Sequence, residues 1–592
     1  MRDRTINSLA IAAFLTFLAV DGTFAQPNNR ELLVGTPIER DLSYGERHAY
    51  PLYLESDQFL YVSVRERGID AYLTLLDSTG AVVTEATDHG GSSGLQSLTL
   101  FSETPGLYWV AVLPRIDGPI QGEYTITLEK MEPVGSTIGE RVDQLFAGWN
   151  RSGSPGAAVA VIRNGQLEHS RGYGFAQLEY GVPIRPNTVF HVASVSKQFT
   201  AFAAVLLEAQ GRISLDDDVR SYVPELHDYG HQITIRHLLY HTSGLRDQWG
   251  LLTMAGWRMD DVITRDQILR LVERQRELNF VPGTEYLYSN TGFTLIAEIV
   301  ERVTGQSFRE WTSANIFQPL GMENTHFHDD HQELVPNRAD SYVHDGNGGF
   351  KKAVLSYANV GATSLFTTVD DMARWVLNFE TGEVGGPDAI RLLRSRGVLS
   401  SGDSLDYAMG QAIGSYRGLL ALYHGGADAG FRSYLLRFPL ERLSVIVLSN
   451  LASIDAGTLA RETAALYLEN RFVATNHGSM IQSTGTEEDS WIRPAGGSQP
   501  ADSVSLSDYG GTFYADELGA LYRLYASNDT LYASHLRLGT MPLHANGFDS
   551  FVTNQWFIRE IAFERDEIGT VIGFRASNER VRGMWFRKQE GF

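Results

Sequence analysis

Cysteine is absent from this 592-residue chain, and lysine is scarce. Without a thiol, the protein has no disulfide, no lipid-modified cysteine and no cysteine nucleophile. Arginine supplies most of the 49 basic residues, which are outnumbered by 71 acidic residues, so the net charge is −22. This excess of negative charge argues against nucleic acid and anionic membrane surfaces as partners.

Long hydrophobic runs are also missing, and no stretch has the roughly 20 apolar residues that cross a bilayer. The first 25 residues instead contain Arg2 and Arg4, an apolar segment at 9–20 and the small residue Ala25. This order is typical of a signal peptide cleaved after about Ala25, so we expect a secreted or periplasmic protein without stable membrane insertion. A retained N-terminal anchor is the alternative interpretation.

The length exceeds what a single hydrophobic core organises, so several folded units are expected after a signal peptide at 1–25. Short alternating strands with Gly and Asp turns predict a β-sandwich domain at 26–134, and this pattern resembles that of jelly-roll accessory domains. Strands at both ends of a helical middle predict an α/β domain at 135–475. The Ser-, Thr- and Gly-rich segment 476–504 predicts a linker, and strands return at 505–592 as a small β-barrel.

One of the few lysines, Lys197, follows Ser194 by three positions at the predicted start of a helix. In a chain that otherwise prefers arginine, a lysine kept here suggests an amine that must release its proton near neutral pH. Such an amine, one helical turn from a serine, could activate it as a nucleophile, and helix dipole and burial would both lower the lysine pKa. In the alternative interpretation Ser194 caps a helix and Lys197 lies on the surface.

The segment 286–292 contains Tyr288 and Asn290 two residues apart. A phenol beside a cationic amine can have a lowered pKa and pass a proton to a leaving group. In an extended stretch the Asn side chain projects to the same side and can hydrogen-bond a substrate carbonyl. A core tyrosine followed by a helix-capping asparagine is the alternative.

A glycine-rich segment contains His424, Gly425, Gly426 and Ala427 at the end of a predicted strand. Glycines there would allow a substrate backbone to approach and pair with the strand edge. The Ala427 N–H could then serve as the second oxyanion donor beside the N–H of Ser194. A glycine-rich hairpin with a surface histidine is the alternative.

The order and contexts of these three elements resemble the serine β-lactamase and penicillin-binding-protein superfamily, specifically its class C β-lactamase-related branch. The family's Ser-x-x-Lys, Tyr-x-Asn and Lys-Thr-Gly or His-x-Gly elements converge on one cleft. Segments 233–245, 319–322 and 365–371 are similar to the family as well, and the resemblance covers about residues 138–472. It implies an antiparallel sheet flanked by helices, and the C-terminal barrel resembles the lipocalin-like appendages of some penicillin-recognising hydrolases.

The resemblance also implies the roles of individual residues. Ser194 would be the acylated nucleophile, and Lys197 its base or proton relay. Tyr288 would be the acid/base partner, while Asn290 would contact the substrate carbonyl. The backbone N–H groups of Ser194 and Ala427 would form the oxyanion hole. No cofactor and no metal enters this mechanism.

The chain departs from the family at His424, which stands where many members have lysine, and no Lys-Thr-Gly occurs. That lysine binds a substrate carboxylate, and histidine is a weaker, pH-dependent cation. We therefore expect an exported serine hydrolase that forms an acyl-enzyme on an ester or amide, of the esterase or D-amino-acid peptidase or carboxypeptidase type, with little efficient β-lactamase activity. Its partner would be a small ester, peptide or cell-wall-derived substrate.

Three alternatives remain open at this point. The chain could be a true β-lactamase, a D-Ala-D-Ala carboxypeptidase, or a non-catalytic scaffold that binds cell wall or peptide. The scaffold would be expected to have lost Ser194, Lys197 or Tyr288, and all three are present.

Two further motifs are interpreted as non-catalytic. The Gly-x-Ser-x-Gly match at 90–94 precedes another predicted strand, whereas a nucleophile elbow needs a helix after the serine. The histidine-rich segment 326–331 could bind a metal, but it lacks the His-Glu-x-x-His pattern. We expect it to be a solvated loop.

Overall fold

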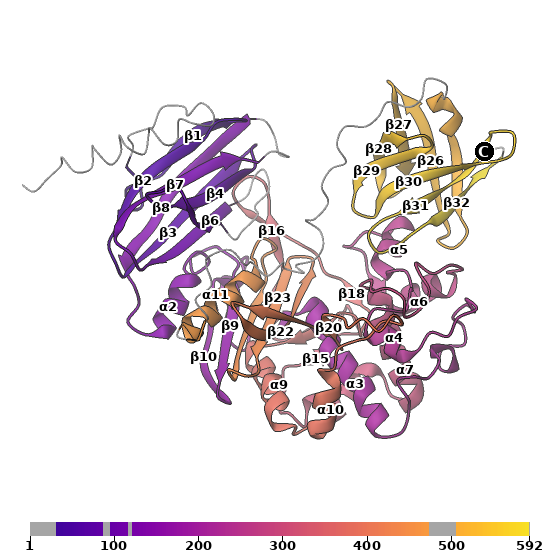
Figure 1. The fold of residues 1–592 in the computed structure, drawn as a ribbon, viewed down its shortest axis with the longest axis horizontal. Coiled ribbons are helices and arrows are strands. Elements are labelled where there is room, and N and C mark those ends of the chain that lie inside the picture. Colours follow the sequence, from indigo (N-terminus) through magenta and orange to yellow (C-terminus); the bar gives the residue numbers. More distant parts are fainter. Residues whose placement is uncertain (1–30, 87–94, 116–120, 470, 473–504, 591–592) are drawn as a thin grey trace, which may run out of the picture.

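The computed structural model describes residues 31–86, 95–115, 121–469, 471–472 and 505–590. The predicted signal peptide, the predicted linker and the Gly-x-Ser-x-Gly match lie outside the described residues. Figure 1 shows a two-sheet domain, a mixed domain and a barrel, with the first and last placed on either side of the middle one. The expected multidomain fold class is confirmed. The exact domain boundaries stay predictions.

The N-terminal domain consists of two four-stranded antiparallel sheets, with strand orders β1-β8-β3-β6 and β2-β7-β4-β5. Eight strands divided in this way form the arrangement of double-sheet jelly rolls. Alternate residues of both sheets meet in an apolar cluster of their own. The strands are β1 Ile38–Ser43, β2 His48–Leu54, β3 Gln58–Arg67, β4 Ala71–Leu76, β5 Val82–Glu85, β6 Leu95–Ser102, β7 Gly106–Pro114 and β8 Gln121–Pro133.

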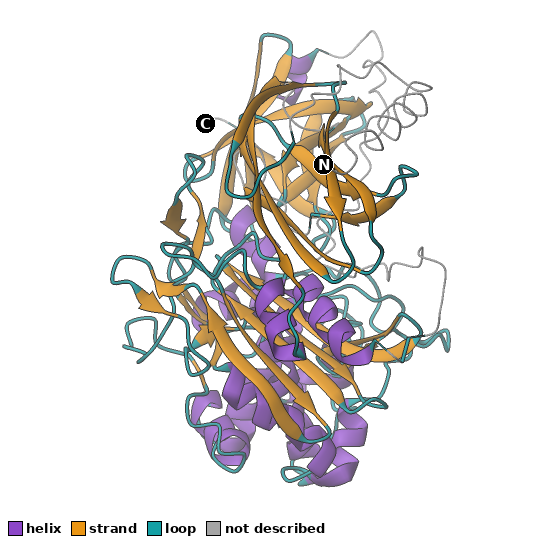
Figure 2. Cartoon of the chain, turned by 90° about the vertical axis from the view of Figure 1, so that its left-hand side faces the viewer, coloured by secondary structure: helices purple, strands orange, loops and turns teal. Residues whose placement is uncertain are grey.

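The middle domain has a seven-stranded antiparallel sheet of order β10-β9-β24-β23-β22-β21-β20, with helices on both faces (Figure 2). Its central strands are apolar on both sides because alternate residues enter two separate cores. Chain segments from the beginning and the end of the domain therefore meet in one sheet. The strands are β9 Ala157–Arg163, β10 Gln166–Tyr173, β20 Tyr407–Ala408, β21 Gln411–Tyr416, β22 Leu419–Asp428, β23 Phe431–Phe438 and β24 Leu443–Ser449.

Helices α2 and α11 cover one face of this sheet, and α3, α7, α9 and α10 lie on the other side. Helix α3 is buried over most of its length, as expected for a helix at the centre of the domain. Among the described residues, no helix combines the length and apolar character needed to cross a membrane. The helices are α2 Ile138–Leu145, α3 Lys197–Ala209, α4 Ile235–Leu239, α5 Gln248–Met254, α6 Arg265–Glu273, α7 Asn290–Thr304, α8 Phe308–Thr312, α9 Val369–Thr381, α10 Gly386–Leu393 and α11 Ala456–Leu468.

Short strands complete the middle domain and shape the loops around the helices. One of them, β13, lies just before helix α3 in the chain and pairs with β19. The short strands are β11 Phe175–Gln177, β12 Val182–Pro183, β13 Phe190–His191, β14 Ile263–Thr264, β15 His326–Phe327, β16 Tyr342–His344, β17 Phe350–Lys352, β18 Tyr357–Ala358 and β19 Leu365–Thr367.

The C-terminal domain is a closed antiparallel barrel in which consecutive strands are neighbours. Its interior is filled by apolar side chains, and that apolar cluster is continuous with the core of the middle domain. Figure 1 shows the barrel above α5. The strands are β25 Gly511–Ala515, β26 Ala520–Ser527, β27 Thr530–His535, β28 Gly539–Gly547, β29 Ser550–Gln555, β30 Ile558–Arg565, β31 Val571–Ser577 and β32 Met584–Gln589.

Candidate active site

Ser194 lies in a single 3-10 turn, Ala193–Ser196, between β13 and α3. The preceding Ala193 has φ of +46°, a left-handed conformation that costs energy for a residue with a Cβ. This bend turns the chain sharply from strand to helix. Ser194 remains partly exposed, whereas its neighbours on both sides are buried.

The Lys197 amino group is in direct contact with Ser194. Lys197 Nζ lies 3.0 Å from Ser194 Oγ, 2.7 Å from Asn290 Oδ1 and 2.8 Å from the Ala362 carbonyl oxygen. A neutral amine has two N–H groups and one lone pair. If the amide oxygen and the carbonyl oxygen, which can only accept, take the two N–H groups, the lone pair points to the serine hydroxyl.

Burial lowers the pKa of Lys197 to about 7. The side chain is 0% exposed, and removal from water disfavours the charged ammonium. The negative charges of Asp428 and Asp247 oppose this shift, and the positive charge of Arg580 adds to it. The direction agrees with the expectation from the sequence, and a lysine with this pKa is partly deprotonated at neutral pH.

Asn290 links the lysine to Asp247, a residue that the sequence analysis did not single out. Asp247 Oδ2 accepts hydrogen bonds from the backbone N–H and the side-chain Nδ2 of Asn290, at 2.6 and 2.8 Å. The amide is therefore oriented with its oxygen toward Lys197. The structure places Asn290 as a buried partner of the lysine, and its predicted contact with a substrate carbonyl stays a prediction. The only sequence signal for Asp247 was its place just after segment 233–245.

Tyr288 packs over the same lysine, with Lys197 Nζ 4.9 Å from the centre of its ring. The His241 ring packs against the tyrosine ring with 4.2 Å between the ring centres and 34° between the ring planes. Burial raises the pKa of Tyr288 above its ordinary value, and a hydrogen bond with Ser194 opposes that rise only partly. The expected lowering of this pKa is therefore wrong, because desolvation outweighs the nearby positive charges. The phenol keeps its proton at neutral pH and can donate it.

His424 belongs to a hydrogen-bonded chain that fixes it in the neutral form. The Ser289 N–H donates to His241 Nδ1 at 3.1 Å, so His241 Nε2 carries the proton and donates to Tyr407 Oη at 3.1 Å. At the other end, His424 Nδ1 donates to the Gly425 carbonyl oxygen at 2.6 Å, which leaves Nε2 to accept from Tyr407 Oη at 3.2 Å. Both ring nitrogens of His424 are thus occupied inside the protein.

Burial also lowers the pKa of His424 to about 4, and the nearby Lys197 charge contributes. The side chain is 8% exposed. The sequence analysis treated His424 as a weak, pH-dependent cation in the place of lysine. The structure corrects this expectation, since a neutral imidazole with both nitrogens engaged cannot pair with a substrate carboxylate.

The glycine-rich end of β22 forms a free strand edge beside the nucleophile. Strand β21 pairs with β22 only as far as Tyr423, so residues 424–428 are paired on the β23 side alone. A Cβ on Gly426 would lie 3.0 Å from the Ser194 backbone nitrogen and 2.4 Å from the Val192 carbonyl oxygen. Only glycine allows this approach. Ala427 follows Gly426 on this edge, and its role as the second oxyanion donor stays a prediction.

Backbone strain gathers around these groups. Ala193, His241, Ser364 and Ala429 all have φ between +46° and +70°. Left-handed conformations of residues with side chains are costly and cluster at functional sites. Here they lie beside the nucleophile, under Tyr288, near the Ala362 carbonyl and after Asp428, respectively.

Two other features lie away from this site. His326, His328 and Glu333 gather their ligand atoms within 4.8 Å, but Arg309 donates to both carboxylate oxygens of Glu333, so that this carboxylate is already held in an ion pair. His326 lies in β15 and His328 is buried, so the expected solvated loop is wrong at this point.

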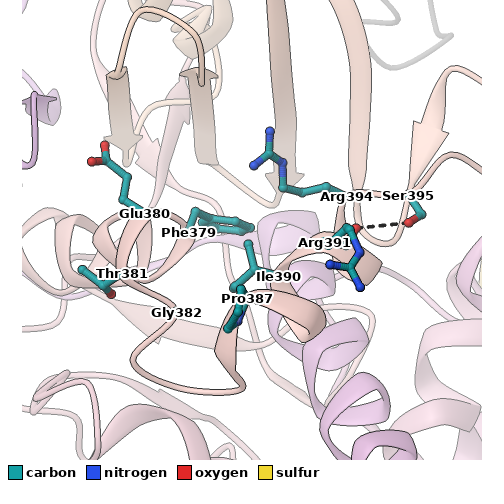
Figure 3. A pocket seen from close by; sticks show the side chains of 9 residues that line it. All are labelled: Phe379, Glu380, Thr381, Gly382, Pro387, Ile390, Arg391, Arg394 and Ser395. Atoms are coloured by element: carbon teal, nitrogen blue, oxygen red, sulfur yellow. Dashed lines mark hydrogen bonds between the residues drawn. The ribbon is translucent and has the colours of Figure 1, made fainter.

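A pocket of about 580 Å³ lies between α9 and α10 and is lined by none of the predicted site residues (Figure 3). Arg391, Arg394 and Glu380 contribute its charged groups, and the Ser395 hydroxyl donates to the Arg391 carbonyl oxygen. Its walls carry no group that resembles the serine-lysine pair.

The fold and the serine-lysine pair together define a serine hydrolase. A family model described as Beta-lactamase matches residues 138–469. This match covers more than half of the chain, and the chain belongs to the Beta-lactamase family.

Two curated relatives are D-aminopeptidases. The D-aminopeptidase of Gluconobacter oxydans (strain 621H) is 33% identical over 298 residues, which cover 50% of this chain and 56% of the relative. The D-aminopeptidase of Brucella anthropi is 32% identical over 302 residues, with the same two coverages. The chain thus spans about half the length of the curated relatives that it matches.

Two solved structures are similar to part of this chain. The penicillin-binding protein from Bacillus halodurans is 25% identical, covers 55% of this chain and 98% of its own, and has a TM-score of 0.49. EstCE1, a hydrolase with promiscuous acyltransferase activity, is 25% identical, covers 56% of this chain and 98% of its own, and has a TM-score of 0.47.

Proposed function

We propose that this protein is an exported serine hydrolase that cleaves small peptides containing D-amino acids, or related amides and esters, through an acyl-enzyme on Ser194. The contact that carries the proposal is the 3.0 Å distance between Lys197 Nζ and Ser194 Oγ. A buried amine with a pKa of about 7 is suited to take the proton of an attacking hydroxyl.

In the acylation step, Ser194 Oγ attacks the substrate carbonyl carbon, and its proton moves to neutral Lys197. The N–H groups of Ser194 and Ala427 stabilise the oxyanion that forms. Tyr288, whose pKa is raised by burial, gives its proton to the departing amine or alcohol when the scissile bond breaks. Lys197, now protonated, returns a proton to the phenolate, so that Lys197 and Tyr288 are restored and the proton of Ser194 has in effect left with the amine or alcohol.

Deacylation runs by the same groups in the opposite sense. A water molecule takes the place of the leaving group and attacks the acyl carbon while its proton passes to the Tyr288–Lys197 pair. The bond between the acyl carbon and Ser194 Oγ then breaks, and the serine recovers its proton. Asn290 and Asp247 hold the amine in position during both steps.

The choice of substrate is supported by the D-aminopeptidase relatives, which match about half of their own length to this chain. A β-lactamase of high efficiency is disfavoured because β22 supplies no cation, His424 being neutral. Export follows from the residues at the N-terminus and is proposed on that basis alone.

A fluorophosphonate probe tests the nucleophile directly. We expect the probe to label the full-length protein. Ser194→Ala should abolish labelling and lower kcat/KM for p-nitrophenyl ester hydrolysis by a factor of about 10³ or more. Ser395→Ala, a serine in the pocket of Figure 3, is the matched control and should keep both. Unchanged ester turnover in Ser194→Ala would contradict the proposal.

A substrate panel tests the chemical class. D-aminoacyl amides, D-Ala-D-Ala, short esters and nitrocefin are compared by kcat/KM, and we expect the D-amino-acid substrates to lead. Nitrocefin turnover that rivals the best ester would show that a neutral His424 does not limit β-lactam hydrolysis.

A further inference from the structure

The loop between β31 and β32 of the barrel, residues 578–583, reaches the active site of the hydrolase domain. We call it the barrel loop. Asn578 Oδ1 accepts hydrogen bonds from the N–H groups of Arg580 and Val581, both at 2.8 Å, which fixes the turn. Val581 is fully buried, and a Cβ on Gly250 of α5 would lie 2.8 Å from its side chain. The loop is therefore packed tightly onto the helix that follows Asp247.

Hydrogen bonds from the hydrolase domain hold the same loop from the other side. The Arg580 carbonyl oxygen accepts from the Asp247 backbone N–H at 3.2 Å and from Asn279 Nδ2 at 2.9 Å. The Arg246 guanidinium, 1% exposed, donates to the Arg582 carbonyl oxygen at 2.9 Å. Asp247 also accepts a hydrogen bond from Asn290, which in turn contacts Lys197 Nζ. Asp247 and Asn290 thus connect the backbone of Arg580 to the lysine by hydrogen bonds.

The side chain of Arg580 points to the catalytic tyrosine. Its guanidinium carbon lies 4.9 Å from the centre of the Tyr288 ring. Within the described residues, this guanidinium has no ion pair and no hydrogen bond, whereas the neighbouring Arg582 pairs with Glu285 at 3.0 Å. A partly buried arginine over an aromatic ring, with none of its five N–H groups bonded to the protein, can donate hydrogen bonds to a planar anion such as a carboxylate.

The other charged groups around the nucleophile are already engaged. Asp247 accepts two hydrogen bonds from Asn290, and Asp428 accepts one from His191 at 2.8 Å. His424 is neutral and has both nitrogens occupied. Lys197 is directed at Ser194. Among the described residues around this site, Arg580 is thus the cation whose side-chain donors have no protein partner.

We propose that Arg580 binds a carboxylate on the leaving-group side of the substrate, so that the barrel supplies the cation that β22 lacks. Tyr288 donates the proton to the leaving group under the proposed function, on which this inference rests, and Arg580 lies against that tyrosine. The substrate class is then a short peptide whose leaving residue has a free α-carboxylate, such as a dipeptide with D-amino acids. This favours the carboxypeptidase-like alternative within the proposed function.

The experiment compares D-Ala-D-Ala with D-Ala-D-Ala amide, two substrates with the same scissile bond that differ in one charge. For the full-length protein we expect kcat/KM to be about 10-fold or more higher for the free acid. Arg580→Gln should lower kcat/KM for the acid by about 10- to 100-fold, mainly through KM, and change the amide by less than about threefold. Measurement at pH 9 keeps Lys197 deprotonated in both proteins, since its pKa is about 7.

Two further variants separate recognition from folding. Arg582→Gln removes an arginine of the same loop whose guanidinium faces Glu285, and it should leave both substrates unchanged. Arg580→Lys should restore part of the preference for the acid, because it restores the charge without the planar fork. Equal losses on acid and amide in Arg580→Gln, or no preference for the acid in the unmodified protein, would overturn the inference. Hydrolysis of a neutral p-nitrophenyl ester by the unmodified protein tests the proposed function separately, since that substrate has no carboxylate.

Discussion

The sandwich and the barrel both flank the hydrolase domain, but they are joined to it in different ways. The sandwich has an apolar cluster of its own, whereas the apolar interior of the barrel continues into the hydrolase core. At the sandwich boundary an exposed arginine, Arg65, donates to the Gly348 carbonyl oxygen at 2.9 Å. At the barrel boundary the buried Arg246 pairs with Glu517 at 3.2 Å and with Glu277 at 3.1 Å.

This difference matters for function. The barrel loop places Arg580 against Tyr288, while the described contacts of Ser194, Lys197 and Tyr288 include no residue of the sandwich. Two β domains with similar strand patterns in the sequence thus have different relations to the active site. A buried charge network and a shared core attach the barrel to the hydrolase domain, and its loop lies against Tyr288.

The largest expected change in the free energy of unfolding comes from replacing Arg246, the buried arginine at the barrel boundary. Arg246→Met should lower the free energy of unfolding by about 3 kcal/mol, because it leaves Glu517 without its buried partner, and it should also lower ester kcat/KM by releasing the barrel loop. Arg65→Met, the matched change at the sandwich boundary, should alter the free energy of unfolding by less than about 0.5 kcal/mol. Chemical denaturation of both variants measures the contrast, and similar values would mean that the two boundaries are equivalent.

A smaller effect is expected from adding one methyl group at each boundary. Gly256 has φ of +92°, and a Cβ there would lie 2.1 Å from the His535 ring of the barrel. Gly256→Ala should therefore cost about 2 kcal/mol of unfolding free energy through strain and overlap.

Gly148→Ala is the control on the sandwich side. A Cβ at Gly148 would lie 2.8 Å from Tyr61 Oη, the far end of a side chain, and the backbone has no positive φ. We expect a cost of about 1 kcal/mol or less. Thermal unfolding that ranks the two variants in the opposite order would contradict the tighter packing assigned to the barrel.

The smallest expected effect is a shift in the pH profile. Lys197 must be neutral to act as a base, and its pKa is about 7, so ester kcat/KM should rise with pH up to about 7 and level off above it. Arg580 lowers this pKa through its positive charge, so Arg580→Gln should raise the pKa of Lys197 and move the rising limb to higher pH. The corresponding change Arg65→Gln should leave the limb in place. A limb that does not move in Arg580→Gln would place the guanidinium too far away to affect the lysine.

Much of the fold could be predicted from the sequence because its signals are local. Alternation of apolar residues indicated the strands of both β domains, and the spacing of Ser194 and Lys197 placed them on adjacent turns of one helix start. The glycines at 425 and 426 were interpreted as room for a substrate backbone, which stays a prediction, whereas the close approach of Gly426 to the backbone of Ser194 was seen only in the structure. The charge states of Tyr288 and His424 were not predictable in this way, because burial by distant segments determines them.

The sequence by itself determined the Ser194–Lys197 spacing, the absence of any thiol chemistry and the lack of a lysine at position 424. The tertiary structure alone decided what that missing lysine means. Burial, to which the nearby Lys197 charge adds, keeps His424 neutral. Arg580 of the barrel lies against Tyr288, and its carbonyl oxygen accepts a hydrogen bond from Asn279, 301 residues away in the chain. Residue types and short spacings can be taken directly from the sequence. A pKa and a contact between domains depend instead on which distant segments folding brings together.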